Sequence, residues 1–194
     1  MPFFQAITDI KSKIDQGDVF SDIYFTAIDA RVNAVVITPT CDLVQEKAQF
    51  IKFISTVSLE LVIKIIADSV GIEESFFHSE NQISSAKQQN ILKMLRRNTT
   101  GNFLLRYYLL PKYEEILPAS YLDFQKVFVL PYHQVREEYL DNRVAKICTP
   151  WRDSITSKYA GYSMRIGTPD YTDDELNNIL KISGLRLPPE DVQA

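Results

Sequence analysis

The sequence has few of the residues that build disulfide frameworks, metal clusters and nucleotide-binding loops. It contains two cysteines, two histidines and six glycines in 194 residues. Two cysteines, Cys41 and Cys148, are too few for a disulfide scaffold and suit a reducing compartment. No CxxC or HxxxH spacing points to a metal cluster, and the glycine motifs that cradle phosphates or dinucleotides are missing. We therefore expect no bound cofactor.

Long apolar runs and an excess of basic charge are also missing. The most apolar stretch, 50–70, is broken by Lys52, Glu60, Lys64 and Asp68, so a membrane span is not expected. The N-terminus lacks the basic start and the apolar run of a signal peptide. A formal charge of −4 argues against a surface that coats nucleic acid, although it allows a local basic patch. We expect a soluble cytoplasmic protein of the bacterial type.

The composition is that of a folded domain, with 45% hydrophobic and 24% charged residues. Segments rich in β-branched and aromatic residues predict strands at 19–27, 34–38, 50–57, 102–110 and 123–130, and 143–148 is a short strand or a helical turn. Hydrophobic spacing and capping residues predict helices at 3–15, 59–69 and 81–97, from Pro150 onward, and after Thr172. Because one helix does not separate each pair of strands, the pattern favours an α+β fold with a mostly antiparallel barrel or curved sheet.

We predict a single domain over 1–194. Its barrel core covers about 16–57 and 102–148, a two-helix insertion covers about 58–98, and a C-terminal helical region covers about 150–184. In that last region Ile155, Tyr159, Tyr162 and Ile166 form one helical stripe, which is typical of a core-facing or partner-facing helix.

Thr38-Pro39-Thr40-Cys41-Asp42 is the most unusual local sequence, because a Cys-Asp pair follows directly after a buried strand. Cys41 is a candidate nucleophile with His133 as its base, or a metal ligand together with His133, Cys148 or His78. Asp42 is a candidate general base or metal ligand. The alternative is structural: a small cysteine and an aspartate that bonds its own turn.

A basic cluster is the second distinctive feature. From Lys87 to Arg106 the charged residues are Lys87, Lys93, Arg96, Arg97 and Arg106, with no acidic residue among them, and Tyr107 and Tyr108 follow. Basic groups beside aromatic rings can bind a nucleic-acid backbone and stack its bases. The alternative is a solvated helix face with arginines at the helix C-terminus.

The first part of the chain resembles the MazF/PemK type of toxin. Gln16-Gly17-Asp18-Val19 leads into a strand and is followed by the apolar strand 34–39, as in that family. Segment 50–58, with Ile54-Ser55-Thr56, is similar to the family's next strand, and 123–135 to its late strand and short helix. The resemblance implies an SH3-like barrel, usually dimeric, that cleaves single-stranded RNA without metal.

The resemblance also implies site residues. An arginine and a Ser/Thr hydroxyl carry the chemistry in that family, and the matching residues are Arg31 and Thr56, with Asp42 as a candidate general base. Here Arg31 does not precede a proline, and Asn33 falls closer to the register of the family arginine. The candidate nucleic-acid-binding residues are Lys93, Arg96, Arg97 and Arg106 of the basic cluster, selected for their charge rather than by the resemblance.

Two other hypotheses stand beside this endoribonuclease or RNA-binding function. The first is a non-catalytic interaction or regulatory module on the same barrel, with a protein partner on the C-terminal or insertion helices. The second is a metal or thiol site built from Cys41 and His133. The Thr-Pro-x-Cys-Asp motif, with Pro150-Trp151-Arg152-Asp153, is also similar to a group of uncharacterised bacterial proteins.

Overall fold

The computed structural model describes residues 1–45, 47–73, 83–99 and 106–164. The chain divides into two compact units, Met1–Tyr162 and Ser163–Ala194. The elements named below lie in the first unit, except for the last residue of α5.

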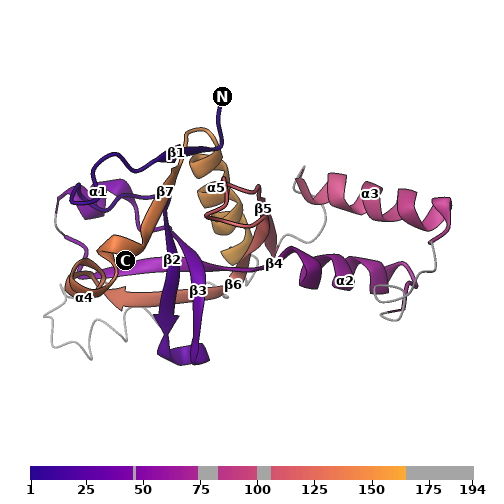
Figure 1. Cartoon of the computed structure of the whole chain (residues 1–194), viewed down its shortest axis with the longest axis horizontal. Helices are drawn as coiled ribbons and strands as arrows, with labels where there is room; N and C mark the ends of the chain where they lie inside the picture. The colour runs from indigo at the N-terminus through magenta and orange to yellow at the C-terminus, as the bar shows by residue number, and fades with distance from the viewer. Residues whose placement is uncertain (46, 74–82, 100–105, 165–194) are drawn as a thin grey trace, which may run out of the picture. The chain divides into compact units, whose positions relative to one another are not determined.

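Within the described ranges the chain contains both strands and helices (Figure 1). The strands are β1 (Phe4–Ala6), β2 (Asp18–Phe25), β3 (Ala30–Val36), β4 (Phe50–Ser58), β5 (Tyr107–Leu110), β6 (Ser120–Pro131) and β7 (Arg143–Ile147). The α-helices are α1 (Thr40–Val44), α2 (Leu59–Ser69), α3 (Ser85–Thr99), α4 (Tyr132–Glu138) and α5 (Trp151–Ser163). Short 3-10 turns occupy Thr26–Ile28 and Leu140–Asn142.

The strands form one sheet in the order β1-β7-β2-β3-β4-β6-β5, and each neighbouring pair is antiparallel. The edge strands are β1 and β5, so the sheet is open and does not close into a barrel. The Phe4 ring on β1 nevertheless lies 5.2 Å from the ring of Tyr113, just after β5. The two edges therefore approach each other through side chains.

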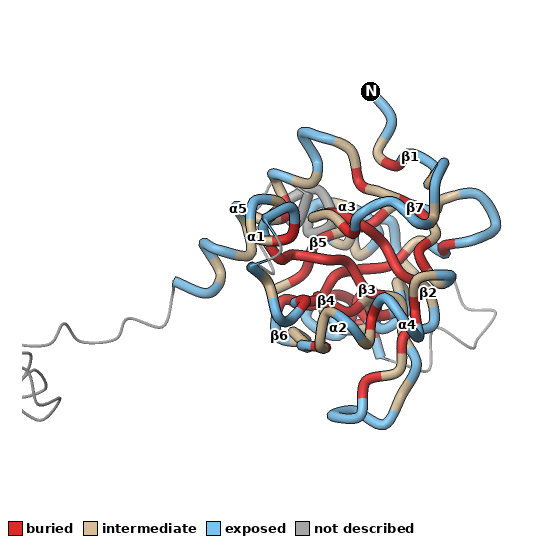
Figure 2. Tube along the Cα trace, turned by 90° about the vertical axis from the view of Figure 1, so that its left-hand side faces the viewer, coloured by how far each residue is buried: buried red, intermediate tan, exposed pale blue. Residues whose placement is uncertain are grey.

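The central strands are buried on both faces, as the apolar sequence of β3 predicts. Val35 belongs to a core cluster with Ile54, Leu122 and Ile147. Ala34 and Val36 face the opposite way, into a second cluster around Phe20, Phe53 and Val135. Figure 2 shows the buried residues following the strands. The sheet thus separates two apolar layers, with α5 contributing to the first and α1 and α4 to the second.

The two-helix segment lies between β4 and β5 in the chain. The Ser58 side chain caps α2 by accepting a hydrogen bond from the Leu61 amide at 3.2 Å, and Gly71 adopts a φ of +70° after the helix. The third core cluster joins Val62 and Ile66 of α2 to Tyr107 and Tyr121. Helices α2 and α3 contact each other, and α3 also contacts β5 (Figure 1).

The α+β class and the antiparallel sheet are confirmed, whereas the helix predicted over 3–15 is wrong. Its first residues form β1, which pairs with β7, and Ile14 is buried as a single anchor in an irregular segment. Pairing with a strand far along the chain overrides the local helical spacing. The short helix α1 follows Pro39, and the segment expected to be a short strand or a helical turn at 143–148 is the strand β7. The helix predicted after Thr172 lies outside the described residues.

In the part of the chain that the structure describes, no helix has the length and apolar character needed to cross a membrane.

Candidate functional site

The structure does not bring Arg31 and Asp42 together, whereas Thr56 lies on β4, the strand that pairs with β3. Arg31 lies near the start of β3, and Asp42 lies in α1, beyond the other end of that strand. The five steps along the strand from Arg31 to Val36 span about 17 Å at 3.3 Å per residue. The Arg31 guanidinium donates to the Asp22 carbonyl oxygen at 3.0 Å and to its Oδ2 at 3.2 Å. Arg31 thus joins β3 to β2 at the exposed end of their hairpin.

Thr56 lines a hollow that also contains Asn33. The hollow has a volume of about 10 Å³, which is room for about one water molecule. Its lining consists of Phe4, Val19, Asn33, Thr56, Leu110, Pro111, Leu117, Pro118 and Ser120, none of which is ionisable. Acid–base catalysis and charge neutralisation need ionisable groups, and this hollow has none in its lining, so it is not suited to a phosphoryl-transfer transition state.

Asn33 also has a structural role at this hollow. Its Oδ1 accepts a hydrogen bond from the Asp22 amide at 3.2 Å. Asp22 has a φ of +55° and lies where the pairing of β2 with β3 shifts register. The Asn33 carboxamide therefore braces a bulge in β2.

Ser55, beside Thr56, lies at an irregularity in the pairing of β4 with β6. The residue is fully buried, and its hydroxyl has no hydrogen-bond partner among the described residues. Because an unpaired buried hydroxyl costs free energy, Ser55→Ala is expected to raise the free energy of unfolding by about 1 kcal/mol. Urea denaturation at constant m-value measures this. A loss of stability instead would mean that the hydroxyl has a hydrogen-bond partner, such as a buried water.

The Thr-Pro-x-Cys-Asp motif and the Gln16-Gly17-Asp18 turn both form hydrogen bonds with the Asp15 carboxylate. Thr40 donates from Oγ1 to Asp15 Oδ1 at 2.5 Å, and the Gln16 amide donates to the same oxygen at 2.8 Å. Lys146 of β7 forms an ion pair with Asp15 Oδ2. Burial raises the pKa of Asp15, but the hydrogen bonds from Lys146 and Thr40 and the charge of Lys146 outweigh it and lower the pKa overall.

Thr38 and Asp42 of the Thr-Pro-x-Cys-Asp motif also accept hydrogen bonds from backbone amides. Thr38 Oγ1 accepts a hydrogen bond from the Lys52 amide at 2.7 Å. The Asp42 carbonyl oxygen accepts from the amides of Lys47 and Ala48 at 3.0 and 3.2 Å. These contacts fix the path of the chain from β3 through α1 into β4.

Asp18, at the start of β2, forms an ion pair with Arg143 of β7. The Arg143 Nε lies 2.9 Å from Asp18 Oδ2, and the side chains are 3% and 0% exposed. The Asp15 amide donates to Asp18 Oδ2 at 2.6 Å, whereas Asp18 Oδ1 has no hydrogen-bond partner among the described residues. Arg143 Nη1 also donates to the carbonyl and hydroxyl oxygens of Ser12, at 3.0 Å each. Burial raises the pKa of Asp18 to about 6, against the lowering effects of the Asp15 amide, Arg143 and Lys146.

We refer to Asp15, Asp18, Thr40, Arg143 and Lys146 as the polar network. It joins the segment before β2, the start of α1 and β7. Sequence reasoning did not select Asp15, Asp18, Arg143 or Lys146. The available signal was charge in strands that are otherwise apolar: Asp18 precedes Val19-Phe20, and Arg143 and Lys146 flank Val144-Ala145.

The shifted pKa of Asp18 predicts a pH dependence of stability. The folded chain binds this proton more tightly than the unfolded chain, because the pKa is about 6 rather than 3.8. The contribution of Asp18 to stability is therefore complete below pH 3.8 and is lost as the pH rises through about 6, a change on the order of 2–3 kcal/mol. Asp15 has a lowered pKa, so its contribution is lost only as the pH falls below 3.8.

Urea denaturation of the wild type and of Asp18→Asn, from pH 4 to pH 7, measures this contribution as the difference between the two curves. The variant should lack the fall in stability that Asp18 causes in the wild type. Parallel curves would contradict a raised pKa for Asp18.

The thiol and imidazole candidates lie at the surface. Cys41 is exposed in α1, with Sγ 3.6 Å from Asp42 Oδ1, and His133 is exposed in α4. Cys148 lies after β7, with Sγ 3.8 Å from Gln5 Oε1. Within the described ranges, no three His, Cys, Asp or Glu residues are grouped so that they could hold a metal ion. His78 lies outside those ranges, and the thiol or metal site stays a prediction.

The basic residues fall into two groups. Arg106 forms a two-pronged ion pair with Asp123, with both hydrogen bonds at 2.6 Å, and its guanidinium lies 5.0 Å from the centre of the Tyr107 ring. The hydrogen bonds to Asp123 raise the pKa of Arg106. Lys93, Arg96 and Arg97 instead belong to α3, where Lys93 is exposed. Arg106 therefore holds the start of β5 to β6, and α3 carries the remaining basic charge.

The tyrosine stripe of α5 packs into the core. The Phe124 ring lies 5.8 Å from the ring of Tyr159 and 5.9 Å from that of Tyr162, and Ile155 is buried in the same cluster. This stripe is therefore a core-facing surface, and the alternative of a partner-facing stripe is not supported for these three residues. Ile166 lies outside the described residues.

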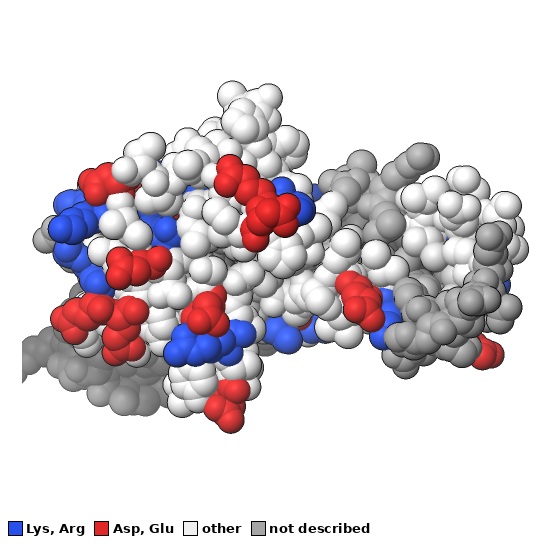
Figure 3. Space-filling model, viewed as in Figure 1, with Lys and Arg blue, Asp and Glu red and all other residues white. Residues whose placement is uncertain are grey.

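Charges of both signs are interspersed on the face shown in Figure 3.

No protein-family model matches the sequence, and a search of curated proteins finds no similar chain.

Proposed function

We propose that this protein binds single-stranded RNA through α3 and leaves the RNA uncut. The observation that carries the proposal is the charge of α3. Over Ser85–Thr99 the helix carries Lys87, Lys93, Arg96 and Arg97 and no acidic residue, in a chain whose net charge is −4. A local basic helix is the electrostatic footprint that nucleic-acid binding requires.

The absence of cleavage is part of the proposal. Arg31 is paired with Asp22, and it lies at the opposite end of β3 from Asp42. The hollow around Thr56 has no ionisable lining residue. Under this proposal the open sheet is a variant of the SH3-like barrel that the resemblance to MazF/PemK proteins suggests. It lacks the RNA-cleaving activity of that family.

Filter binding of a labelled, unstructured single-stranded RNA at a series of salt concentrations tests the proposal. The Lys87 ammonium already donates to the Gly71 carbonyl oxygen at 2.7 Å. Phosphate contacts from Lys93, Arg96 and Arg97 should therefore give a slope of log K against log salt of about −2, at −0.7 per contact. A duplex RNA serves as the comparison ligand. If no RNA is retained at low salt, the proposal is wrong.

Exposed apolar residues on α2 favour a second candidate function, a protein-interaction module. Leu61 and Ile65 lie one helical turn apart and are 46% and 39% exposed. This function predicts that RNA binding is absent and that the double substitution Leu61→Ser/Ile65→Ser abolishes capture of the partner. RNA binding that depends on the charge of α3 favours the first proposal instead.

A further inference from the structure

The edge strand β1 is held by segments that are far away in the sequence. Its three residues pair with 145–147 of β7. The Phe3 ring, just before β1, stacks on Trp151 with ring centres 5.4 Å apart. The Phe4 ring lies 5.2 Å from that of Tyr113. Because the apolar spacing of this segment favours a helix, these distant contacts, rather than local propensity, hold β1 as a strand.

The place that β1 occupies has to be filled. Phe4 is buried, belongs to the first core cluster and lines the hollow near Thr56. Without β1, the backbone of β7 would lose a pairing partner and the first core cluster would open to water, and both changes cost free energy. A chain that releases its own β1 therefore needs another strand in its place. The sequence that the structure shows to fit there is that of β1 itself.

The connection from β1 to β2 is suited to act as a hinge. Residues 7–17, all of which the structure describes, contain no helix or strand. The end of this connection near β2 is fixed, because Ser12 accepts two hydrogen bonds from Arg143 and Ile14 is buried in the second core cluster. Movement is therefore confined to residues 7–11.

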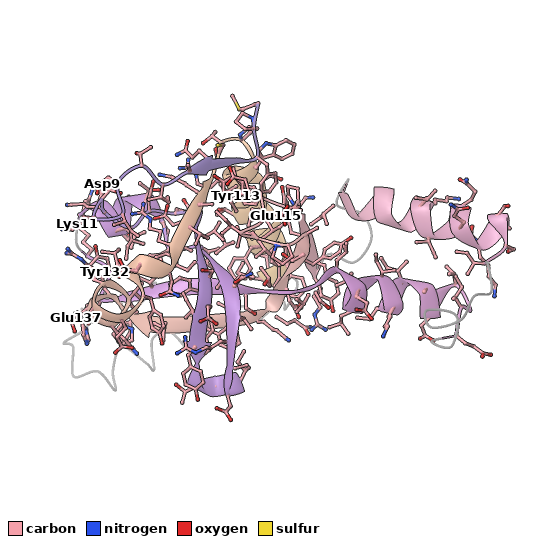
Figure 4. The ribbon with its side chains drawn as sticks, in the orientation of Figure 1. Asp9, Lys11, Tyr113, Glu115, Tyr132 and Glu137 are labelled. Atoms are coloured by element: carbon pink, nitrogen blue, oxygen red, sulfur yellow. The ribbon has the colours of Figure 1, made fainter. Side chains whose placement is uncertain are left out.

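A turn folds this hinge back on itself. The Lys11 amide donates to Asp9 Oδ1 at 2.9 Å, and the Ser12 amide donates to the Asp9 carbonyl oxygen at 3.2 Å. Figure 4 shows Asp9 and Lys11 at the outer margin of the molecule. When the turn opens, the five residues 7–11 can span about 17 Å at 3.3 Å per residue, which leads β1 away from its own β7 and toward a neighbouring copy.

We propose that two copies of this chain exchange their β1 strands, so that β1 of each copy pairs with β7 of the other. Exchange of an identical element is a low-cost route to a dimer, because each copy regains the contacts that it gives up. The rings of Phe3 and Phe4 would then pack against Trp151 and Tyr113 of the other copy. Since the contacts of β1 are the same in both forms, the hinge and the protein concentration decide the balance between monomer and dimer. The proposal does not depend on RNA binding, although the dimer would carry α3 twice.

Light scattering during size-exclusion chromatography measures the mass of the particle over a wide range of concentrations. A particle of twice the chain mass is expected, in a fraction that increases with concentration. Deleting residues 8–11 should raise the dimer fraction, because a short hinge favours exchange, and a glycine-serine insertion after Thr8 should lower it. If the wild type and the shortened variant both remain monomers, or if hinge length does not change the dimer fraction, the proposal is wrong.

A cross-link identifies the copy that supplies β1. Cys148 Sγ lies 3.8 Å from Gln5 Oε1, so the variant Gln5→Cys/Cys41→Ser places its two thiols close together across β1 and β7. A short bis-maleimide should join two chains in the dimer fraction and join the thiols of one chain in the monomer fraction, which a denaturing gel distinguishes. Cys41→Ser alone is the matched control and should run as a single chain, and circular dichroism establishes that both variants are folded. A dimer fraction of the double variant that yields only single chains after cross-linking would overturn the proposal.

Discussion

Replacing Arg143 with methionine is expected to lower the free energy of unfolding at pH 7 by about 3–5 kcal/mol, because it leaves Asp18 in the core without its cation. The variant also loses both hydrogen bonds to Ser12. For a chain of this length the melting temperature should fall by roughly 6–20 °C. Below pH 4, where Asp18 is protonated, the difference between variant and wild type should shrink.

The matched control for this experiment removes both charges. Asp18→Leu/Arg143→Met should regain most of the stability that Arg143→Met loses, because replacing a whole buried pair with apolar residues is often neutral or stabilising. Urea denaturation of the four proteins in this double-mutant cycle gives the coupling free energy of the pair. A coupling close to zero would contradict the view that Asp18 and Arg143 act as one unit.

Neutralising α3 is the substitution with the largest expected effect on binding. Changing Lys87, Lys93, Arg96 and Arg97 to glutamine should weaken single-stranded RNA binding roughly hundredfold or more at low salt and bring the salt slope close to zero. Glutamine has a helix propensity similar to that of lysine and arginine, so α3 should keep its structure. Filter binding measures both the affinity and the slope.

A control variant with the same change in net charge keeps this result specific. It replaces four lysines outside α3 with glutamine: Lys11, Lys47, Lys52 and Lys126. If this variant loses as much affinity as the α3 variant, binding depends on the net charge of the chain and the role assigned to α3 is wrong.

The sequence predicted those elements whose causes are local. The bounds of α2 follow from the Ser58 cap and from Gly71. The β-branched run predicted at 34–38 covers only the second half of β3, which begins at Ala30 and ends at Val36. The start of the chain was mispredicted, because Phe4–Ala6 is held by β7, far away in the sequence. The spacing of hydrophobic residues within one segment contains no information about a strand that pairs with it from far along the chain.

The candidate site was harder to predict for the same reason. The sequence drew attention to Thr40 and to the Gly17-Asp18 turn, but the partners of this region, Arg143 and Lys146, lie more than a hundred residues later. Arg31 and Thr56 were selected by resemblance to one family and Asp42 by its place after a buried strand, and Asp42 lies beyond the opposite end of β3 from Arg31. In the structure Thr38, Thr40 and Arg31 form hydrogen bonds that hold segments of the fold together. The local sequence could not distinguish this structural role from a catalytic one.

The proposed function predicts an RNA that is bound and remains intact. The most direct test incubates a labelled single-stranded RNA with the protein at low salt, then measures the retained fraction and the length of the RNA from the same sample. The account predicts a retained, full-length RNA whose binding weakens steeply as salt is added. RNA that is cut, or that is not retained at low salt, would contradict it.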